Sequence, residues 1–211
     1  MKLYFCCESL SGYVLKIKFY SGANTTGPER GHEEQIVRDV IEQYQDVGHT
    51  VYMDSYFSTH QLFSDLLSLQ TTACGTVRQD RRGLPKHITK KELRLQKGDV
   101  VERDKEDIVA VRYQDKRDIM LLSTIHDGRV VDTGRRDKRT DEPIHKPNIV
   151  HQYNRFMKGV DLIDMYLSFY SFNSKTLKRW KRATTHLIHL ACIQAHILYR
   201  KSTTSDSPFS L

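Results

Sequence analysis

The sequence predicts an α/β protein with a mixed β-sheet and flanking helices. Two strand-like segments, Lys2–Glu8 and Tyr13–Tyr20, are joined by a turn at Ser11-Gly12. Helical and strand-like patterns then alternate as far as Val77, so that the whole segment reads β-β-α-β-α-β. That succession is typical of a mixed sheet covered by helices. A chain of 211 residues with 38% hydrophobic residues is long enough for one domain with a sizeable core, or for one domain that carries an insertion.

Each early element has a pattern of its own. In the second strand Leu15, Ile17 and Phe19 alternate with lysines, which predicts one buried face and one solvent-exposed face. The strand Thr50–Met53 is short and β-favouring, and Ala73–Val77 is another short apolar strand. Apolar residues at helical spacing predict two helices. The first contains Ile36, Val37, Val40, Ile41 and Tyr44 and ends before Gly48, and the second contains Leu62, Phe63, Leu66 and Leu67.

From residue 80 to residue 148 the character of the chain changes. Charge density rises, and two strands, Ile108–Tyr113 and Asp118–Thr124, flank a polar turn. We therefore expect an N-terminal part of the core at 1–79 and an insertion-like, strand-containing subdomain at 80–148. A C-terminal helical part of the core follows at 149–201, and 202–211 forms a flexible tail.

The last helix has an apolar stripe and a polar side. Its polar side carries His189, Cys192 and His196, which we interpret as a polar face rather than a zinc site, because structural zinc needs four well-placed ligands. The expected stripe consists of Trp180, Ala183, Leu187, Leu190, Ala191 and Leu198.

Composition excludes several classes of protein. No stretch approaches the roughly 18 apolar residues of a membrane span, and we see no secretory signal, so a secreted or membrane protein is not expected. The four cysteines include no C-x-x-C pair, which argues against a disulfide framework and fits a reducing compartment.

The basic residues gather in two runs within a chain of net charge +7. Such runs indicate either a polyanion-binding surface or a solvated basic surface. The candidate nucleic-acid-binding residues are Arg78, Arg81, Arg82, Lys175, Lys178, Arg179 and Arg182.

The most informative stretch is Val51-Tyr52-Met53-Asp54-Ser55-Tyr56-Phe57-Ser58-Thr59. It reads as a strand that ends in the carboxylate of Asp54, followed by a helix that Ser58 or Thr59 can cap. A carboxylate at the carboxyl end of a strand lies where α/β sheets bind ligands. Taken alone, a turn or cap aspartate is the commoner interpretation.

Four segments in order change that balance. They are Asp54-Ser55-Tyr56-Phe57, Gly75-Thr76-Val77-Arg78 with the following Arg81-Arg82-Gly83, Leu121-Leu122-Ser123-Thr124, and Tyr153-Asn154-Arg155-Phe156-Met157-Lys158-Gly159-Val160-Asp161-Leu162-Ile163-Asp164. In this order they resemble the catalytic domain of piggyBac-type transposases and their domesticated descendants, over Lys2 to Leu198. The resemblance implies an RNase H-like fold, interrupted by an inserted domain, that cuts and joins DNA with acidic residues and Mg²⁺.

The resemblance also implies which acids are catalytic. Asp54 matches the second acidic position of the family, Asp161 matches the third, and Asp164 matches an additional acid near it. Asp54 and Asp161 are the expected metal ligands. The first acidic position, on the first strand of the fold, has no match, so the expected sheet is incomplete. Two motif positions depart mildly from the family, with Ser55 in place of an asparagine and Lys158 in place of a glycine.

These features leave competing functions. The leading hypothesis is a transposase-derived remnant that is inactive alone and binds DNA or serves as an interaction module. The alternative is an active metal-dependent DNA transposase whose first acid comes from an upstream segment or a partner. The expected partners are double-stranded DNA without sequence preference and a homodimer or full-length transposase-like protein. The resemblance implies a nuclear location, with the cytoplasm as the alternative.

Overall fold

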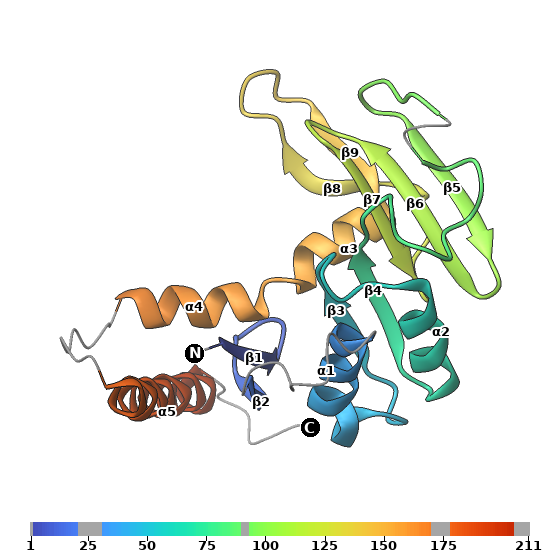
Figure 1. Cartoon of the computed structure of the whole chain (residues 1–211). Helices are drawn as coiled ribbons and strands as arrows, with labels where there is room; N and C mark the ends of the chain where they lie inside the picture. The colour runs from blue at the N-terminus through green and yellow to red at the C-terminus, as the bar shows by residue number, and fades with distance from the viewer. Residues whose placement is uncertain (1, 21–30, 90–92, 170–177, 205–211) are drawn as a thin grey trace. The chain divides into compact units, whose positions relative to one another are not determined.

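The computed structural model describes residues 2–20, 31–89, 93–169 and 178–204, apart from the side chains of Arg179 and Thr204 (Figure 1). The chain divides into two compact units, one formed by residues 1–28 with 158–211 and the other by residues 29–157. Each unit has its own sheet and its own hydrophobic core. Across the described part of the chain, no helix combines the length and apolar character needed to cross a membrane.

The unit 29–157 contains most of the strands. Its elements are α1 (His32–Ile41), the 3-10 helix η1 (Glu42–Tyr44), β3 (Thr50–Met53), α2 (His60–Ser68), β4 (Thr72–Thr76), β5 (Val100–Lys105), β6 (Ile108–Gln114), β7 (Asp118–Ser123), β8 (Val130–Arg136), β9 (Pro143–Pro147) and α3 (Asn148–Phe156). The predicted strand Thr50–Met53 and the predicted helices around Ile36 and Leu62 are confirmed.

A mixed five-stranded sheet forms the centre of this unit, in the order β3-β4-β7-β6-β5. β3 and β4 are parallel, whereas the other neighbours are antiparallel. The expected mixed α/β architecture is therefore confirmed. β8 and β9 form a separate two-stranded sheet.

The boundaries expected at residues 79 and 148 differ from this arrangement. β4, which precedes residue 79, pairs with β7, which follows it, so β5 to β7 extend the same sheet rather than forming one of their own. After residue 148, α3 contacts β4 and β7, while the later helices belong to the other unit.

Helices cover both faces of the five-stranded sheet. One face displays Cys74, Val111 and Leu121, which pack with Ile149 and Val150 of α3. Because side chains alternate along a strand, Ala110 and Leu122 lie on the opposite face, which α2 covers through its contacts with β4 and β6. The buried side of α2 consists of His60, Leu62, Phe63 and Leu66.

The other unit consists of a hairpin and two helices. Its elements are β1 (Lys2–Cys7), β2 (Val14–Tyr20), α4 (Gly159–Phe169) and α5 (Arg179–Thr204). Ile163 of α4 packs with Leu190, Ile193 and Ile197 of α5, and Ile17 lies against this cluster. The expected burial of Leu15 and Phe19 is wrong, since these side chains are 38% and 49% exposed at the two ends of the strand.

The expected orientation of the last helix is also wrong in part. Trp180, Leu187 and Leu198 are exposed, while Leu190 of the expected stripe is buried together with Ile193 and Ile197, so the buried face is rotated relative to that stripe. Both sides of α5 carry apolar residues at helical spacing, so the pattern alone could not choose between them. His189, expected on a polar face, is buried beside the core.

A buried ion pair joins the sheet to the segment that precedes β5. The guanidinium of Arg112, which is 1% exposed, donates from Nε and Nη2 to the two carboxylate oxygens of Asp118, both at 2.9 Å. Its Nη1 donates to the carbonyls of Ile88 (3.1 Å) and Leu93 (2.7 Å). Gln79 donates to the same carboxylate at 3.1 Å. This pair therefore fixes β7 and the backbone carbonyls of Ile88 and Leu93 against β6.

We expect the Asp118→Asn substitution to destabilise the unit by about 3–5 kcal/mol, because it leaves the buried Arg112 charge uncompensated. Urea unfolding monitored by circular dichroism measures this change. As a matched control, Asp80→Asn removes an exposed partner of Arg78 and should cost less than about 1 kcal/mol. Equal unfolding midpoints for the two variants would contradict the structural role of the pair.

Candidate functional site

Asp54 directly follows β3 and begins a turn. Its Oδ1 accepts a hydrogen bond from the backbone N–H of Tyr56 (2.9 Å), and its carbonyl accepts from the hydroxyl of Ser58 (2.9 Å) and from the backbone N–H groups of Phe57 (3.3 Å) and Ser58 (3.2 Å). The side chain is exposed. Asp54 thus combines both predicted features, because it ends a strand and it shapes a turn with one carboxylate oxygen.

The turn after β3 lies closely against β4. Gly75 pairs with Met53 across the two parallel strands. A Cβ atom at residue 75 would lie 2.5 Å from Ser58 Oγ and 2.6 Å from the carbonyl oxygen of Met53, distances that no side chain tolerates. The glycine of the Gly-Thr-Val-Arg segment therefore allows the Asp54 turn to approach the neighbouring strand.

Arg81 holds the same turn from the other side. Its Nη2 donates to the carbonyls of Tyr56 (2.8 Å) and Ser55 (3.5 Å), and the residue is half-buried. Arg78 and Arg82, by contrast, are exposed, and Arg78 pairs with Asp80. Of the first basic run, Arg78 and Arg82 lie on the surface, whereas Arg81 supports the backbone next to Asp54.

Aromatic contacts fix β3 on its other face. The hydroxyl of Tyr52 lies 3.0 Å from Nε2 of His126, and its ring centroid lies 5.3 Å from that of Phe156 at the end of α3. Burial raises the pKa of Tyr52 to about 12 and lowers the pKa of His126, so both groups are neutral near pH 7. These contacts connect the strand that ends in Asp54 with α3.

Asp161 and Asp164 lie near the start of α4. They are three residues apart and both exposed, so they share one face of the helix, as expected. Burial and the neighbouring charge of Asp161 raise the pKa of Asp164, and His186 of α5 offsets only part of this increase. Cys7 is also close, and burial raises the pKa of its thiol to about 12, with further increases from Cys6 and Asp164. The sequence alone gave no signal for these contacts from Cys7 and His186.

A second glycine positions this pair of acids. A Cβ atom at Gly159 would lie 2.9 Å from the carbonyl oxygen of Glu8 and 3.2 Å from Cβ of Cys7. On the hairpin, Gly12 has a φ of +73° and lies against Leu162. The first turn of α4 therefore packs closely against the β1–β2 turn, and this contact fixes the position of the helix start that carries Asp161.

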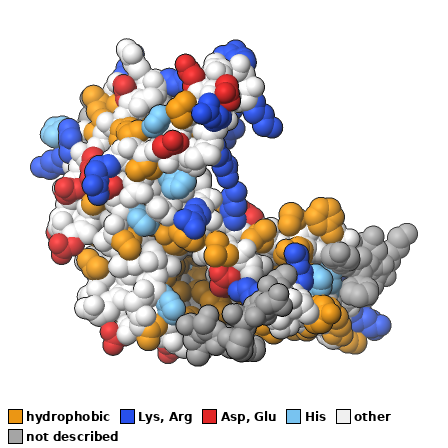
Figure 2. All heavy atoms as spheres, turned by 180° about the vertical axis from the view of Figure 1, so that it is seen from behind, with side chains coloured by type: hydrophobic (Ala, Val, Ile, Leu, Met, Phe, Trp, Pro, Cys, Tyr) orange, Lys and Arg blue, Asp and Glu red, His pale blue; other side chains and the backbone are white. Residues whose placement is uncertain are grey.

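The second basic run is described only in part. Lys178 and Arg182 are exposed. Arg179 opens α5, but its side chain lies outside the described residues, as does Lys175. On the face drawn in Figure 2, Lys and Arg side chains are interspersed with acidic ones rather than gathered into one continuous area.

The expected acids are divided between the two compact units. Asp161 and Asp164 adjoin within one unit, whereas Asp54 belongs to the other. Within the described ranges, no group of three or more His, Cys, Asp and Glu side chains forms a metal site. The expectation that Asp54 and Asp161 share a metal ion therefore stays a prediction.

We expect the Arg81→Gln substitution to loosen the Asp54 turn, because it removes the guanidinium donor to the Tyr56 carbonyl. A local loss of about 1 kcal/mol would speed hydrogen exchange at the Phe57 and Ser58 amides roughly fivefold. NMR-detected exchange measures this change. Arg82→Gln, at the exposed neighbouring arginine, is the control, and equal rates in both variants would disprove the role of Arg81.

If Asp54 and Asp161 share a metal site, Mn²⁺ bound near Asp161 should broaden the amide signals of Asp54 and Ser55. The Asp161→Asn substitution should abolish this broadening, because it removes a carboxylate ligand. The Asp115→Asn variant is the control, since the Asp115 carboxylate pairs with Lys146 (2.7 Å) elsewhere in the chain. Broadening confined to the residues around α4 would show that the two acids do not converge.

Comparison with known proteins places this geometry in a family. The family profile described as "Transposase IS4" matches residues 1–196. The human piggyBac transposable element-derived protein 2 is 22% identical over 92% of this chain and 35% of its own length. The human piggyBac transposable element-derived protein 3 is 26% identical over 84% of this chain and 31% of its own length.

The fold matches a solved structure as well. The piggyBac transposase in a synaptic complex with hairpin DNA superposes with a TM-score of 0.79 at 23% identity, over 99% of this chain and 43% of that one. The chain spans about a third of the length of the two human relatives. The chain therefore belongs to the transposase family described as Transposase IS4, and its resemblance to piggyBac-type transposases is confirmed.

Proposed function

We propose that this chain is an RNase H-like segment derived from a cut-and-paste DNA transposase, and that it binds double-stranded DNA but does not cut DNA by itself. The observation that carries this proposal is the placement of Asp54 at the exposed end of β3, in a turn that Gly75 and Arg81 support. The adjoining carboxylates of Asp161 and Asp164 supply the other acids that match the family.

The acids of α4 fit a divalent cation. Burial and the like charge of Asp161 raise the pKa of Asp164, and a bound cation would offset the repulsion between the two carboxylates. Mg²⁺ in phosphoryl-transfer sites is commonly held by one or two carboxylates, with water and substrate phosphates completing its coordination. Asp161 with Asp54 would hold the ion in this proposal. When bound, the ion would neutralise phosphate charge during in-line displacement.

The proposed inactivity follows from the number of acids. Two-metal phosphoryl transfer requires carboxylates that converge from several elements. The unit 29–157 contributes Asp54, and the other unit contributes Asp161 and Asp164. No residue of this chain matches the first acidic position of the family, so stabilisation of the transition state would be incomplete.

One observation favours the alternative, an active transposase completed by a further segment or a partner. β3 is an edge strand, and within the described residues only β4 pairs with it. Unpaired backbone groups on the outer edge of β3 offer hydrogen bonds to an additional strand, directly beside Asp54. A strand that supplied the missing acid would pair at this edge.

DNA binding is supported by the basic residues on the surface. Arg78, Arg82, Lys178 and Arg182 are exposed, and the solved transposase relative is itself a complex with hairpin DNA. We include Arg81, Lys175 and Arg179 among the proposed DNA contacts on sequence grounds alone. A nuclear location, and a homodimer or a transposase-like protein as partner, belong to the same proposal.

We expect duplex binding that is independent of sequence and falls steeply with salt, because phosphate contacts release counterions. Charge reversal at Lys178, Arg179 and Arg182 should weaken binding to every duplex alike. Fluorescence anisotropy over a range of salt concentrations measures this, with Arg103→Glu, an exposed cation outside the candidate residues, as a single-site control. Undetectable binding by the unmodified chain at low salt would remove the proposed DNA interaction.

We expect no DNA cleavage or joining by the 211-residue chain with Mg²⁺ or Mn²⁺, because the missing acid removes both metal affinity and transition-state stabilisation. Such electrostatic contributions are commonly worth several kcal/mol, or orders of magnitude in rate. Hairpin formation and strand transfer on DNA with piggyBac-type ends are the assays, with Asp54→Ala for comparison. Activity that disappears in Asp54→Ala would contradict the proposed inactivity and favour the alternative.

A further inference from the structure

The last helix carries a second apolar face, which is exposed. Ile193 and Ile197 pack against α4 and the hairpin, but another apolar stripe lies on the side of α5 turned away from them. Trp180 and Tyr199 stand at the two ends of this stripe and are 63% and 67% exposed. The stripe consists of Trp180, Leu187, Ile188, Ala191, Leu198 and Tyr199.

These residues recur at helical spacing, so they form one continuous surface. Leu187 follows Trp180 by about two turns of the helix, and Leu198 follows Leu187 by about three. The small side chains of Ala191 and Ala195, which are one turn apart and exposed, let another backbone approach the middle of the stripe closely. From its first to its last residue the stripe extends over about 28 Å of helix.

An apolar surface of this extent is typical of an interface. Single exposed apolar residues are common on proteins and need no explanation. A contiguous patch is different, because covering it with another molecule removes a large apolar area from water. A stripe that runs along a helix, with small residues at its centre, fits a second helix whose side chains pack between its own. The surface therefore suits an amphipathic helix of about 20 residues.

The charge of α5 determines which amphipathic helix fits. None of its 26 residues is an aspartate or a glutamate. Because successive helical residues are rotated by about 100°, Lys181, Arg182 and Arg200 all lie to one side of the stripe. The Nζ of Lys181 lies 5.6 Å from the centre of the Trp180 ring, so a cation borders the stripe at its N-terminal end. Acidic residues beside the apolar stripe of a partner helix would be attracted to this side.

Other occupants fit this charge less well. Antiparallel pairing with a second copy of α5 would bring Lys181 of one copy near Arg200 of the other, and parallel pairing would bring identical cations together. Like charges that face each other weaken an association. DNA would attract the cations, but its charged backbone offers no apolar surface to cover Ile188 and Leu198.

We propose that the exposed stripe of α5 binds an acidic amphipathic helix of another protein. The partner would bury aliphatic side chains against Trp180, Ile188 and Leu198, and its carboxylates would lie beside Lys181 and Arg200. This interaction goes beyond DNA binding and does not depend on it, because neither Lys181 nor Arg200 is among the candidate DNA contacts.

The test uses two synthetic amphipathic peptides of about 20 residues, the length that spans the stripe. Both carry the same helical stripe of leucines, which glutamates flank in one peptide and lysines in the other. Trp180 is the only tryptophan of the chain, so a blue shift of its emission reports burial of the stripe directly. We expect the acidic peptide to bind the full chain and to shift the emission, and the basic peptide to do neither.

Two double variants separate the apolar part of the interaction from its ionic part. The acidic peptide carries a fluorescent label, and anisotropy measures its affinity. Ile188→Gln with Leu198→Gln should weaken binding about a hundredfold, because two apolar side chains are no longer buried. Lys181→Glu with Arg200→Glu should weaken it about tenfold at low salt, and this effect should shrink as salt screens the charges.

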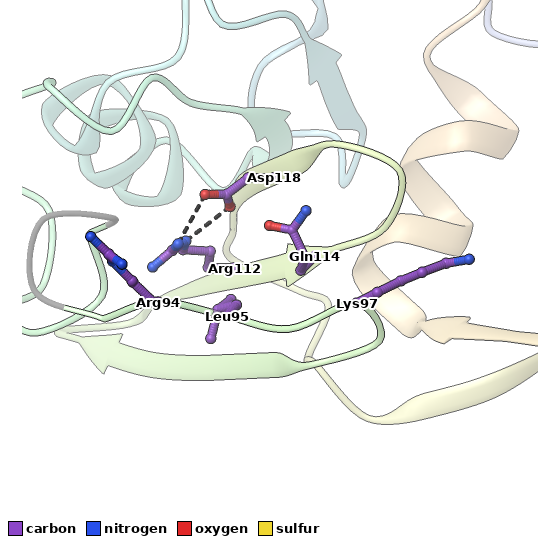
Figure 3. Close-up of a pocket in the computed structure, with 6 residues that line it drawn as sticks. All are labelled: Arg94, Leu95, Lys97, Arg112, Gln114 and Asp118. Atoms are coloured by element: carbon purple, nitrogen blue, oxygen red, sulfur yellow. Dashed lines mark hydrogen bonds and ion pairs between the residues drawn. The ribbon is translucent and has the colours of Figure 1, made fainter.

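Each double variant has a matched control in the unit 29–157. The apolar control is Ile125→Gln with Val130→Gln, which alters two exposed side chains. The ionic control is Arg94→Glu with Lys97→Glu, two exposed cations that line a pocket of about 390 Å³ (Figure 3). Neither control should change the affinity for the acidic peptide. Unchanged circular dichroism would show that every variant keeps its helices.

Several outcomes would overturn the inference. Equal affinity for the two peptides, or no binding of either, would remove the acidic helix as the ligand. A blue shift of Trp180 that grows with protein concentration in the absence of peptide would assign the stripe to a second copy. A shift caused by phosphatidylcholine–phosphatidylserine vesicles, without binding of the acidic peptide, would assign it to a membrane surface. Weaker binding of the acidic peptide in both α5 variants, with both controls unchanged, would support the inference.

Discussion

The buried ion pair between Arg112 and Asp118 is the interaction on which the unit 29–157 depends. A guanidinium removed from water is tolerated only when a carboxylate and further acceptors replace its hydration. Here the carboxylate comes from the start of β7, and the carbonyls come from Ile88 and Leu93. Burial of the Arg112 charge therefore favours one conformation of the long connection from β4 to β5, in which Ile88 and Leu93 lie against the sheet.

That connection also determines the surroundings of Asp54. Arg81 lies at its beginning and donates to the carbonyls of the Asp54 turn. Gly83, with a φ of +88°, passes so close to His60 that a Cβ atom would lie 3.0 Å from that side chain. One end of the connection is therefore anchored on β6 and β7, and the other end supports the candidate site. A positively charged side chain can therefore support a site by donating hydrogen bonds to backbone carbonyls, as well as by binding a ligand.

Local patterns predicted the elements, but not the partners of charged side chains. Thr50–Met53 and α1 were recognised because apolar and β-favouring residues recur at strand and helix spacing. The charge of Arg81 predicts a DNA contact, but it does not predict the hydrogen bonds to the Ser55 and Tyr56 carbonyls, which only the folded chain brings near. The face of α5 could not be chosen for a similar reason. Ile193 and Leu198 are equally apolar, and their burial depends on where α4 and the hairpin lie.

Backbone contacts explain why the two sets of acids can keep their local geometry independently. Gly75 brings the Asp54 turn against β4, and Gly159 brings the first turn of α4 against the hairpin. Each contact lies within one compact unit, so each unit fixes the direction of its own carboxylates. Metal-dependent chemistry additionally requires the units to hold those carboxylates at a common distance from one ion. Correct local geometry at Asp54 and Asp161 is therefore necessary for the proposed shared metal ion, and the docking of the two units decides whether one ion can contact both carboxylates.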